Sequence, residues 1–264
     1  MKKLLSILLS SVLALPLAGD EQAFADFKHQ DIMPSGAAFK VGEYLKYRVH
    51  YGILDAGYAE LRVSREAEKY GHETYHVIGT GWSTGMFNWF FKVKDRYESY
   101  IDQKHLVPHY FIRDVYEGGY EINRDISFNH NTNKAYTENK EFDVPVGVQD
   151  LLSSFYYARS LDVSGMQPGD YFDIPLFLDM ENYTMRMKYL GLETINSDVG
   201  KFECMKFRPM VQVGNVFRDE EALSLWVTND DNHVPIRAQA DVLVGSIKMD
   251  LIEYRNTKTK LNPL

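Results

Sequence analysis

The sequence predicts a mainly β protein, built as a large antiparallel barrel or a strongly curved half-barrel with one short helix. Two observations lead to this prediction: apolar and polar residues alternate along most of the chain, and clusters of turn-forming residues separate the alternating runs. Strands with one apolar and one polar face, joined by short turns, are typical of antiparallel hairpins. A sheet of about ten such strands has to curl, which favours a barrel.

The alternation is clearest from Tyr44 to Tyr51, where every second residue is apolar or aromatic. Further runs with the same period lie at 59–64, 93–101, 109–116, 120–128, 170–178, 183–190, 202–213, 222–228 and 234–244. Turn formers separate most of them, at 54–57, 117–119, 129–133, 196–198 and 229–232.

One segment breaks this pattern. Asp150 can cap a helix in which Leu151, Leu152, Phe155 and Ala158 share one face, and a Pro-Gly pair follows it. A single helix within a β chain commonly plugs a barrel end or covers a sheet. Strands of the same character lie on both sides of it, which favours one domain over two.

The first residues have the parts of a secretory signal. Lys2 and Lys3 precede an apolar run from Leu4 to Leu17, and small residues follow. The run is too short for a membrane-spanning helix, which needs about 20 residues. We therefore expect residues 1–25 to be a cleavable signal peptide of a bacterial precursor, and residues 26–264 to form a single exported β domain.

Composition excludes several classes of partner. The net charge is −8 and no basic run exceeds two residues, which argues against nucleic acid and against electrostatic docking on anionic lipid. Cys204 is the only cysteine, so a disulfide framework is excluded, and its alternating setting predicts a buried thiol. No stretch after the signal is apolar enough to span a membrane as a helix.

Several short patterns follow one another in a defined order. They are FKVGEYLKY at 39–47, AGYA at 56–59, VKDRYESYID at 93–102 with LVP at 106–108, VP at 144–145, QDLLSSFY at 149–156, GKFEC at 200–204, and LWVTND at 225–230 leading to VPIR at 234–237. Together they resemble the bacterial exported family catalogued as domain of unknown function 3108. The resemblance implies a cell-envelope protein, periplasmic in a two-membrane bacterium, with an antiparallel barrel-like fold. It implies no activity and no catalytic residues.

Ser83 lies in a Gly-Trp-Ser-Thr-Gly segment that matches the G-x-S-x-G nucleophile pattern. That chemistry needs a serine at a strand-to-helix turn of a parallel sheet, followed by an acid and a histidine. The predicted sheet is antiparallel, so we interpret the segment as a glycine-flanked turn.

Two histidine pairs, His72 with His76 and His105 with His109, have the spacing that chelates a metal on a helix. On strands, four residues span about 13 Å, which is too far for one metal ion to bind both. We therefore predict surface or core histidines, no metal site and no cofactor, and leave open a site assembled from distant strands. The carboxylates likewise form no recognisable pair, although two carboxyls across a cleft would not be visible in the sequence.

An aromatic segment between residues 82 and 91 shows no alternation. Its large side chains either fill the core as an irregular crossing, or they present apolar surface that receives an apolar or sugar ligand. The candidate ligand-binding residues are Trp82, Met86, Phe87, Trp89 and Phe90.

These observations favour a non-enzymatic envelope protein, a β scaffold that binds a lipid-like or glycan ligand, or a protein partner, on its concave side. The alternative is a periplasmic hydrolase that uses Ser83 or a carboxylate pair. Neither the ligand nor the oligomeric state follows from the sequence.

The processing site gives the first testable prediction. Ala23 and Ala25 supply the small residues that a signal peptidase recognises, so the mature protein should begin near Asp26. N-terminal sequencing of the exported protein checks this. Retention of residues 4–17 would contradict both the expected location and the expected domain limits.

Overall fold

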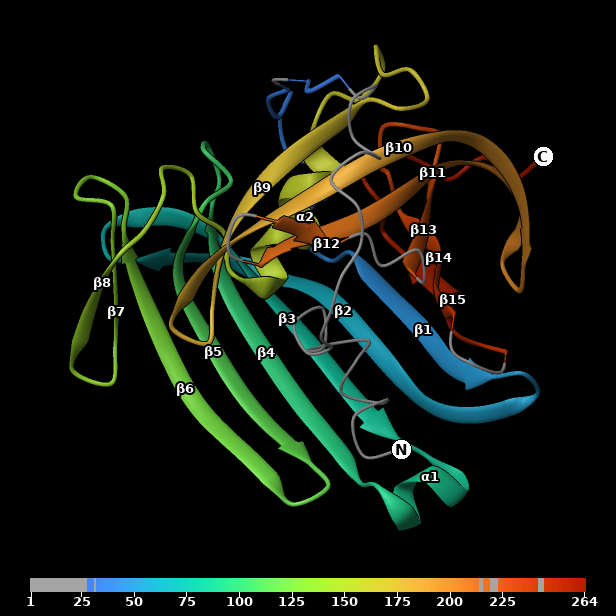
Figure 1. The fold of residues 1–264 in the computed structure, drawn as a ribbon, viewed down its shortest axis with the longest axis horizontal. Helices are drawn as coiled ribbons and strands as arrows, with labels where there is room; N and C mark the ends of the chain where they lie inside the picture. Colours follow the sequence, from blue (N-terminus) through green and yellow to red (C-terminus); the bar gives the residue numbers. More distant parts are fainter. Residues whose placement is uncertain (1–27, 31, 214–215, 219–222, 242–244) are drawn as a thin grey trace.

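The computed structural model describes residues 28–30, 32–213, 216–218, 223–241 and 245–264 (Figure 1). The expected signal peptide, residues 1–25, lies outside the described residues. Within the described part, one curled antiparallel sheet of 15 strands surrounds a central helix. No described helix meets the length and hydropathy that a membrane span requires.

The sheet takes up most of the chain, and each strand pairs mainly with its neighbours in sequence. The strands are β1 (Tyr44–Tyr51), β2 (Leu54–Lys69), β3 (His72–Ser83), β4 (Val93–Asp102), β5 (Pro108–Glu117), β6 (Tyr120–Asn129), β7 (Lys134–Thr137), β8 (Lys140–Asp143), β9 (Tyr171–Leu178), β10 (Glu181–Ser197), β11 (Gly200–Val213), β12 (Val216–Arg218), β13 (Leu223–Thr228), β14 (Pro235–Asp241) and β15 (Ser246–Arg255).

The strand order shows how the sheet is assembled. It runs β8-β7-β6-β5-β4-β3-β2-β1-β15-β14-β13-β11-β10-β9, with β12 paired to β11. The first and last strands of the chain, β1 and β15, pair in the middle of this order, while β8 and β9 are its two ends. The sheet is therefore strongly curved but not closed, which confirms the predicted fold class in its half-barrel form.

The segment after β8 joins the two ends of the sheet. The Gln149 backbone N–H donates to the Pro175 carbonyl at 2.8 Å, and the Phe177 N–H donates to the Gln149 carbonyl at 2.9 Å. These bonds form a parallel bridge between Gln149 and Leu176 on β9. The edge of β9 is thereby covered, which limits its pairing with other chains.

The strand predictions were mostly confirmed, and their errors have local causes. Five strands fall outside the predicted runs: β3, β7, β8, β12 and β15. In β15, a register shift against β1 interrupts the alternation near Ile252, where Lys46 pairs with Glu253 and Tyr47 pairs with Leu251. The turn between β1 and β2 falls at residues 52–53 rather than at 54–57, since Gly52 adopts a left-handed conformation (φ 56°).

The predicted helix is confirmed as α2 (Leu151–Ser160), and Asp150 caps it. Asp150 Oδ1 accepts the N–H groups of Leu152 and Ser153, both at 2.7 Å. Its other oxygen accepts the Ser99 hydroxyl from β4 at 2.6 Å, which ties the start of the helix to the sheet. Burial raises the pKa of Asp150 to about 6, although these hydrogen bonds oppose the shift.

α2 lies inside the curl of the sheet (Figure 1). Leu152 and Tyr156 are buried in one cluster with inward-facing strand residues such as Val77, Tyr97 and Phe111. The helix therefore occupies the middle of the concave side, where the sequence analysis placed the ligand.

The end of α2 is held by a buried ion pair. Arg159 and Glu43 form two hydrogen bonds, Nη1 to Oε1 at 2.7 Å and Nη2 to Oε2 at 2.9 Å. Both side chains are almost fully buried. Arg159 Nε also donates to the Asn232 carbonyl at 3.1 Å, so the pair links the helix to the segments before β1 and before β14.

We expect Glu43→Gln to lower the free energy of unfolding by about 3–5 kcal/mol, because it leaves the buried Arg159 guanidinium without a counter-charge. The double variant Glu43→Met with Arg159→Met should recover much of this loss. Urea unfolding measures the stability of both variants. The control is Asp143→Asn, which breaks the exposed ion pair with Lys134 and should change the free energy of unfolding by less than about 1 kcal/mol. Equal effects of Glu43→Gln and Asp143→Asn would contradict the role given to the buried pair.

Candidate functional site

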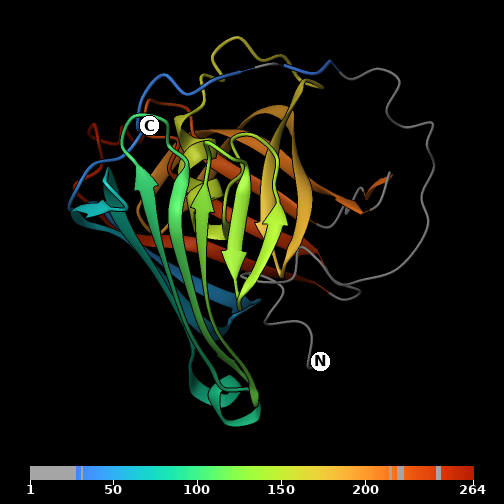
Figure 2. The same cartoon turned by 90° about the vertical axis from the view of Figure 1, so that its left-hand side faces the viewer.

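The aromatic segment forms the short helix α1 (Gly85–Phe90) at the end of the β3–β4 hairpin (Figures 1 and 2). Trp89 is 82% exposed, and Met86 and Phe90 are also exposed. The interpretation of these three residues as core is therefore wrong. The short helix with apolar surface, the other possibility raised by the sequence, is what the structure contains.

The remaining two candidate residues make packing contacts. Phe87 is half-buried against the small cluster of Val49, Ala56 and Ile247, and it anchors α1 to the sheet. Trp82 lies on β3, where its ring centroid is 6.0 Å from that of Tyr58. The structure thus exposes Met86, Trp89 and Phe90 on α1, packs Phe87 against the sheet and places Trp82 against Tyr58 on β3.

Neighbouring turns add further exposed apolar side chains. In an antiparallel sheet the β1–β2, β3–β4 and β5–β6 connections lie at the same end of the strands, as Figure 1 shows. From here on, each of the two ends of the strands is called an edge of the sheet. Ile53 is 99% exposed at the first of these connections, next to exposed Leu54, and exposed Tyr120 begins β6 at the third. We call the exposed residues at this edge the apolar rim: Ile53, Leu54, Met86, Trp89, Phe90 and Tyr120.

Three of the six residues of the apolar rim were not among the candidate residues predicted from the sequence. Ile53, Leu54 and Tyr120 lie in or beside turns that were recognised only as strand boundaries. An isoleucine within a turn was the available signal, because hydrophobic residues are unusual there.

Gly118 allows the β5–β6 turn to pack closely against the end of the α1 segment. Its φ is 57°, a left-handed conformation that glycine adopts without steric cost. A Cβ at this position would lie 2.3 Å from the Phe91 ring, so a larger residue would push the turn away from α1. The close approach keeps the rim residues of two successive hairpins next to each other.

Ser83 has a structural role in the same hairpin. Its hydroxyl accepts the Val93 N–H at 2.8 Å and donates to Asn88 Oδ1 at 3.0 Å, which closes the loop around α1. The flanking strands are antiparallel, and these described partners are neither a histidine nor an acid. The segment leaves a strand, as expected, but it is not a turn: residues 81–83 end β3, Thr84 is the N-cap of α1 and Gly85 begins that helix.

A pair of carboxyl groups lies on the inner face of β4 and β5. Asp95 and Glu117 are 3% and 7% exposed, and a hydrogen bond joins them. Burial first, and then the neighbouring Glu117, raise the pKa of Asp95, so the two groups share a proton. The pair is buried away from any substrate and is closer together than the separation of about 5–9.5 Å used in glycoside hydrolysis, so it offers the hydrolase alternative little support.

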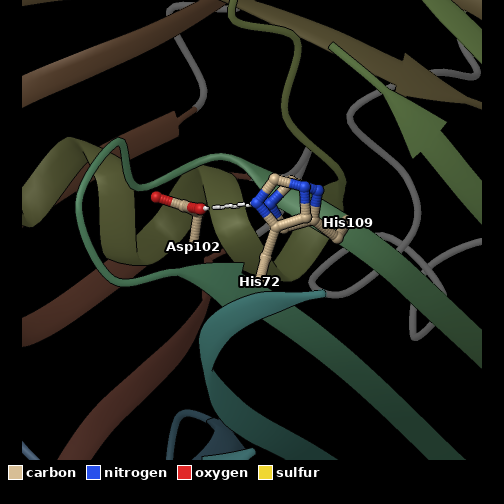
Figure 3. Close-up of side chains that lie close together, drawn as sticks. All are labelled: His72, Asp102 and His109. Carbon is tan, nitrogen blue, oxygen red and sulfur yellow. Dashed lines mark hydrogen bonds and ion pairs between the residues drawn. The ribbon is translucent and has the colours of Figure 1, made fainter. Parts of the chain in front are cut away.

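At the opposite edge of the sheet, residues from three strands meet (Figure 3). His72 begins β3, Asp102 ends β4, and His109 lies near the start of β5. Asp102 Oδ2 is 3.1 Å from His109 Nε2 and 3.6 Å from His72 Nδ1. The two imidazole rings stack, with centroids 3.8 Å apart and planes 19° from parallel. We call these three residues the His-Asp cluster.

Two further histidines adjoin the His-Asp cluster. His105 Nδ1 is 3.1 Å from Asp102 Oδ1, and the His130 ring lies 5.7 Å from that of His109. Four of the eight histidines of the chain therefore gather at this edge. Burial lowers the pKa of both His109 and His130, which favours their neutral forms.

Asp102 is held in its charged form. Burial alone raises the pKa of Asp102, but the His105 backbone N–H, the His109 side chain and the Lys104 N–H outweigh that effect and lower it. The cluster thus combines a carboxylate whose pKa is lowered with the His109 imidazole, whose pKa is also lowered.

The spacing argument holds for His72 and His76, which both lie on β3. It is wrong for His105 and His109, because His105 lies in the β4–β5 turn and both side chains contact Asp102 at 3.1 Å. His76, four residues after His72, is bonded to Glu98 at 2.6 Å instead. The cluster arises because β3 and β4 are antiparallel, with Thr74 opposite Asp102, so the start of one strand meets the end of the next. The structure thus realises the possibility left open above, a group of potential ligands from different strands.

Comparison with known proteins identifies the family. The profile described as "Protein of unknown function (DUF3108)" matches residues 46–252, and the chain belongs to this family. This confirms the resemblance drawn from the sequence. No curated protein matches the chain.

Among solved structures, the chain is similar to a β-barrel-like protein of domain of unknown function DUF1849 from Brucella abortus. The TM-score is 0.57 at 10% identity, over 83% of this chain and 99% of that chain. A protein from Bacteroides fragilis described as exported, with a YmcC-like fold, matches at TM-score 0.34 and 11% identity, over 83% and 99%. A protein from Parabacteroides distasonis described as a lipoprotein matches at TM-score 0.36 and 12% identity, over 86% and 100%. The first similarity supports the barrel-like fold.

The buried carboxyl pair predicts a pH dependence of stability. A carboxyl whose pKa is raised on folding binds its proton more tightly in the folded state, so stability falls as the pH rises above about 4, the pKa in the unfolded chain. Asp95→Asn removes this titration and should be more stable than the wild type at pH 8, by about 1–3 kcal/mol.

Urea unfolding between pH 4 and pH 8 measures this difference. The matched control is Asp114→Asn, an exposed position on the other face of β5, which should follow the wild-type curve. If Asp95→Asn has the same pH dependence as the wild type, the proton-sharing interpretation is wrong.

Proposed function

We propose that this protein is a non-enzymatic component of the cell envelope that docks on a lipid surface through its apolar rim. One observation carries the proposal: three successive hairpin ends present large apolar side chains to solvent at the same edge of the sheet. Contiguous exposed apolar surface is uncommon on soluble proteins and marks sites of association. The predicted signal peptide supports an exported, periplasmic location, where membrane surfaces are accessible.

The shape of the rim favours a surface over a small ligand. Sites for small molecules are concave and bury most of the ligand. The rim instead projects from the sheet, with α1 at the tip of the tapering hairpins (Figure 2), and its residues are about half to fully exposed. The concave side is occupied by α2 at its middle. A lipid surface can bury all the projecting side chains at once, whereas a single sugar or fatty acid can contact only a few of them.

The residue types favour lipid over a protein partner. Tryptophan and tyrosine are enriched at membrane–water interfaces, where an apolar ring and a polar group are both accommodated. Lys92 and Lys94, both exposed, directly follow the α1 segment and can reach headgroup phosphates. The chain as a whole is acidic, so apolar burial must supply most of the affinity, about 1.5–3 kcal/mol for each large side chain that becomes fully buried.

Vesicle flotation tests this proposal with the untagged chain from residue 26 to 264. The wild type should float with phosphatidylcholine vesicles, and added salt should change the bound fraction little. Trp89→Ser with Phe90→Ser should reduce vesicle affinity at least tenfold, which corresponds to about 1.4 kcal/mol. Because both side chains are exposed, the free energy of unfolding should change by less than about 0.5 kcal/mol.

The control replaces two exposed apolar residues at the opposite edge, Tyr70→Ser with Val146→Ser, and should bind vesicles like the wild type. Failure of the wild type to bind vesicles, or equal losses in both double variants, would overturn the proposal. A change in tryptophan fluorescence with soluble fatty acid or oligosaccharide, without vesicle binding, would also overturn it, in favour of a small ligand.

A further inference from the structure

The His-Asp cluster has the composition and geometry of a metal site, and it is independent of the apolar rim. We propose that His72 Nδ1, His109 Nε2 and Asp102 Oδ2 bind a divalent transition metal ion of the Zn²⁺ class. Two imidazoles and one carboxylate form a ligand set common in zinc sites with an open position. Imidazole ligands favour zinc, copper and nickel over calcium and magnesium, which prefer oxygen.

The distances between the ligand atoms suit a tetrahedral ion. With bonds of about 2.0–2.1 Å, two ligands of such an ion lie roughly 3.3–3.5 Å apart. In the cluster, Asp102 Oδ2 lies 3.1 Å from His109 Nε2 and 3.6 Å from His72 Nδ1, and all three ligand atoms lie within 4.8 Å of one another. To bind one ion, the two stacked rings must turn until the ion lies in the plane of each, and the exposed His72 side chain is the one with room to do so.

A simple hydrogen-bond cluster accounts less well for the position of His72. At 3.6 Å, His72 Nδ1 lies beyond the normal range for a hydrogen bond to Asp102. The other histidine–carboxylate pair of these strands, His76 with Glu98, closes to 2.6 Å. His109 Nε2 is already bonded to Asp102 Oδ2, and an ion bound to all three residues would give His72 a closer partner than its 3.6 Å contact with Asp102.

The surroundings fix the orientation of the carboxylate. Asp102 Oδ1 accepts the backbone N–H groups of Lys104 at 2.9 Å and of His105 at 2.7 Å. These bonds occupy one oxygen and leave Oδ2 directed at the two imidazoles, as Figure 3 shows. Backbone hydrogen bonds of this kind orient metal ligands in established sites and raise metal affinity.

His105 and water are the candidates for the fourth position. The His105 side chain is 65% exposed and already contacts Asp102, so it can turn toward the ion. His130 is less suited, because its Nε2 is bonded to the Pro108 carbonyl at 2.7 Å. The cluster lies at the edge opposite the apolar rim. The two are about 30 Å apart along β4, because the strand has 10 residues and each advances it by about 3.3 Å.

Isothermal titration calorimetry of the untagged chain 26–264 with ZnCl₂ tests the proposal, together with the visible spectrum on titration with CoCl₂. The wild type should bind one equivalent of Zn²⁺, and Co²⁺ should give the intense absorption of a four-coordinate site with nitrogen ligands. His72→Gln and His109→Gln should each weaken Zn²⁺ binding by more than about 100-fold, since even the loss of an outer hydrogen bond costs 10–100-fold. Bound Zn²⁺ should raise the melting temperature of the wild type, but not that of His72→Gln or His109→Gln.

The matched control is His76→Gln, which removes a buried histidine from an equivalent carboxylate pair outside the cluster and should leave Zn²⁺ affinity unchanged. His72 is partly exposed, so His72→Gln should fold normally and keep its vesicle binding. Absence of Zn²⁺ and Co²⁺ binding by the wild type would overturn the proposal. Binding that survives both His72→Gln and His109→Gln, or that is lost in His76→Gln, would do the same.

Discussion

The rest of the structure depends on the packing of α2 inside the curled sheet. The sheet does not close through strand pairing, so its curvature needs a filled concave side. Leu152 and Tyr156 supply apolar contacts there, and the ends of the helix are fixed by Asp150 with Ser99 and by Arg159 with Glu43. A buried ion pair adds little net stability, but it tolerates few geometries. It therefore sets where the helix lies relative to both halves of the sheet.

This arrangement leaves the two edges of the sheet available for function. Hairpin turns emerge alternately at the two edges, so residues far apart in sequence meet at each. One edge carries the apolar rim, for which we propose contact with lipid. The other carries the His-Asp cluster, for which we propose a metal ion.

The interior of the half-barrel also contains ionisable side chains that belong neither to the apolar rim nor to the His-Asp cluster. Asp95 and Glu117 share a proton on the inner face, and Arg113 near them bonds to Asp179 in the β9–β10 turn at 2.7 Å. That bond crosses from one half of the sheet to the other, next to the place where Gln149 bridges to β9. The open side of the half-barrel is thus held by polar contacts between side chains as well as by backbone pairing.

The sequence by itself determined most of the strands, the helix capped by Asp150 and the antiparallel arrangement, because alternation, capping and turn formation are local properties of the chain. The order of its short motifs also identified the family. It also identified the aromatic segment as exceptional, but it could not decide between core and surface, since burial depends on what packs against a segment. Only the tertiary structure decided that Trp89 and Phe90 are exposed, at the same end of the strands as Ile53. It alone brought His72, Asp102 and His109 together, because the register between neighbouring strands, rather than the spacing within one strand, sets the distances between them.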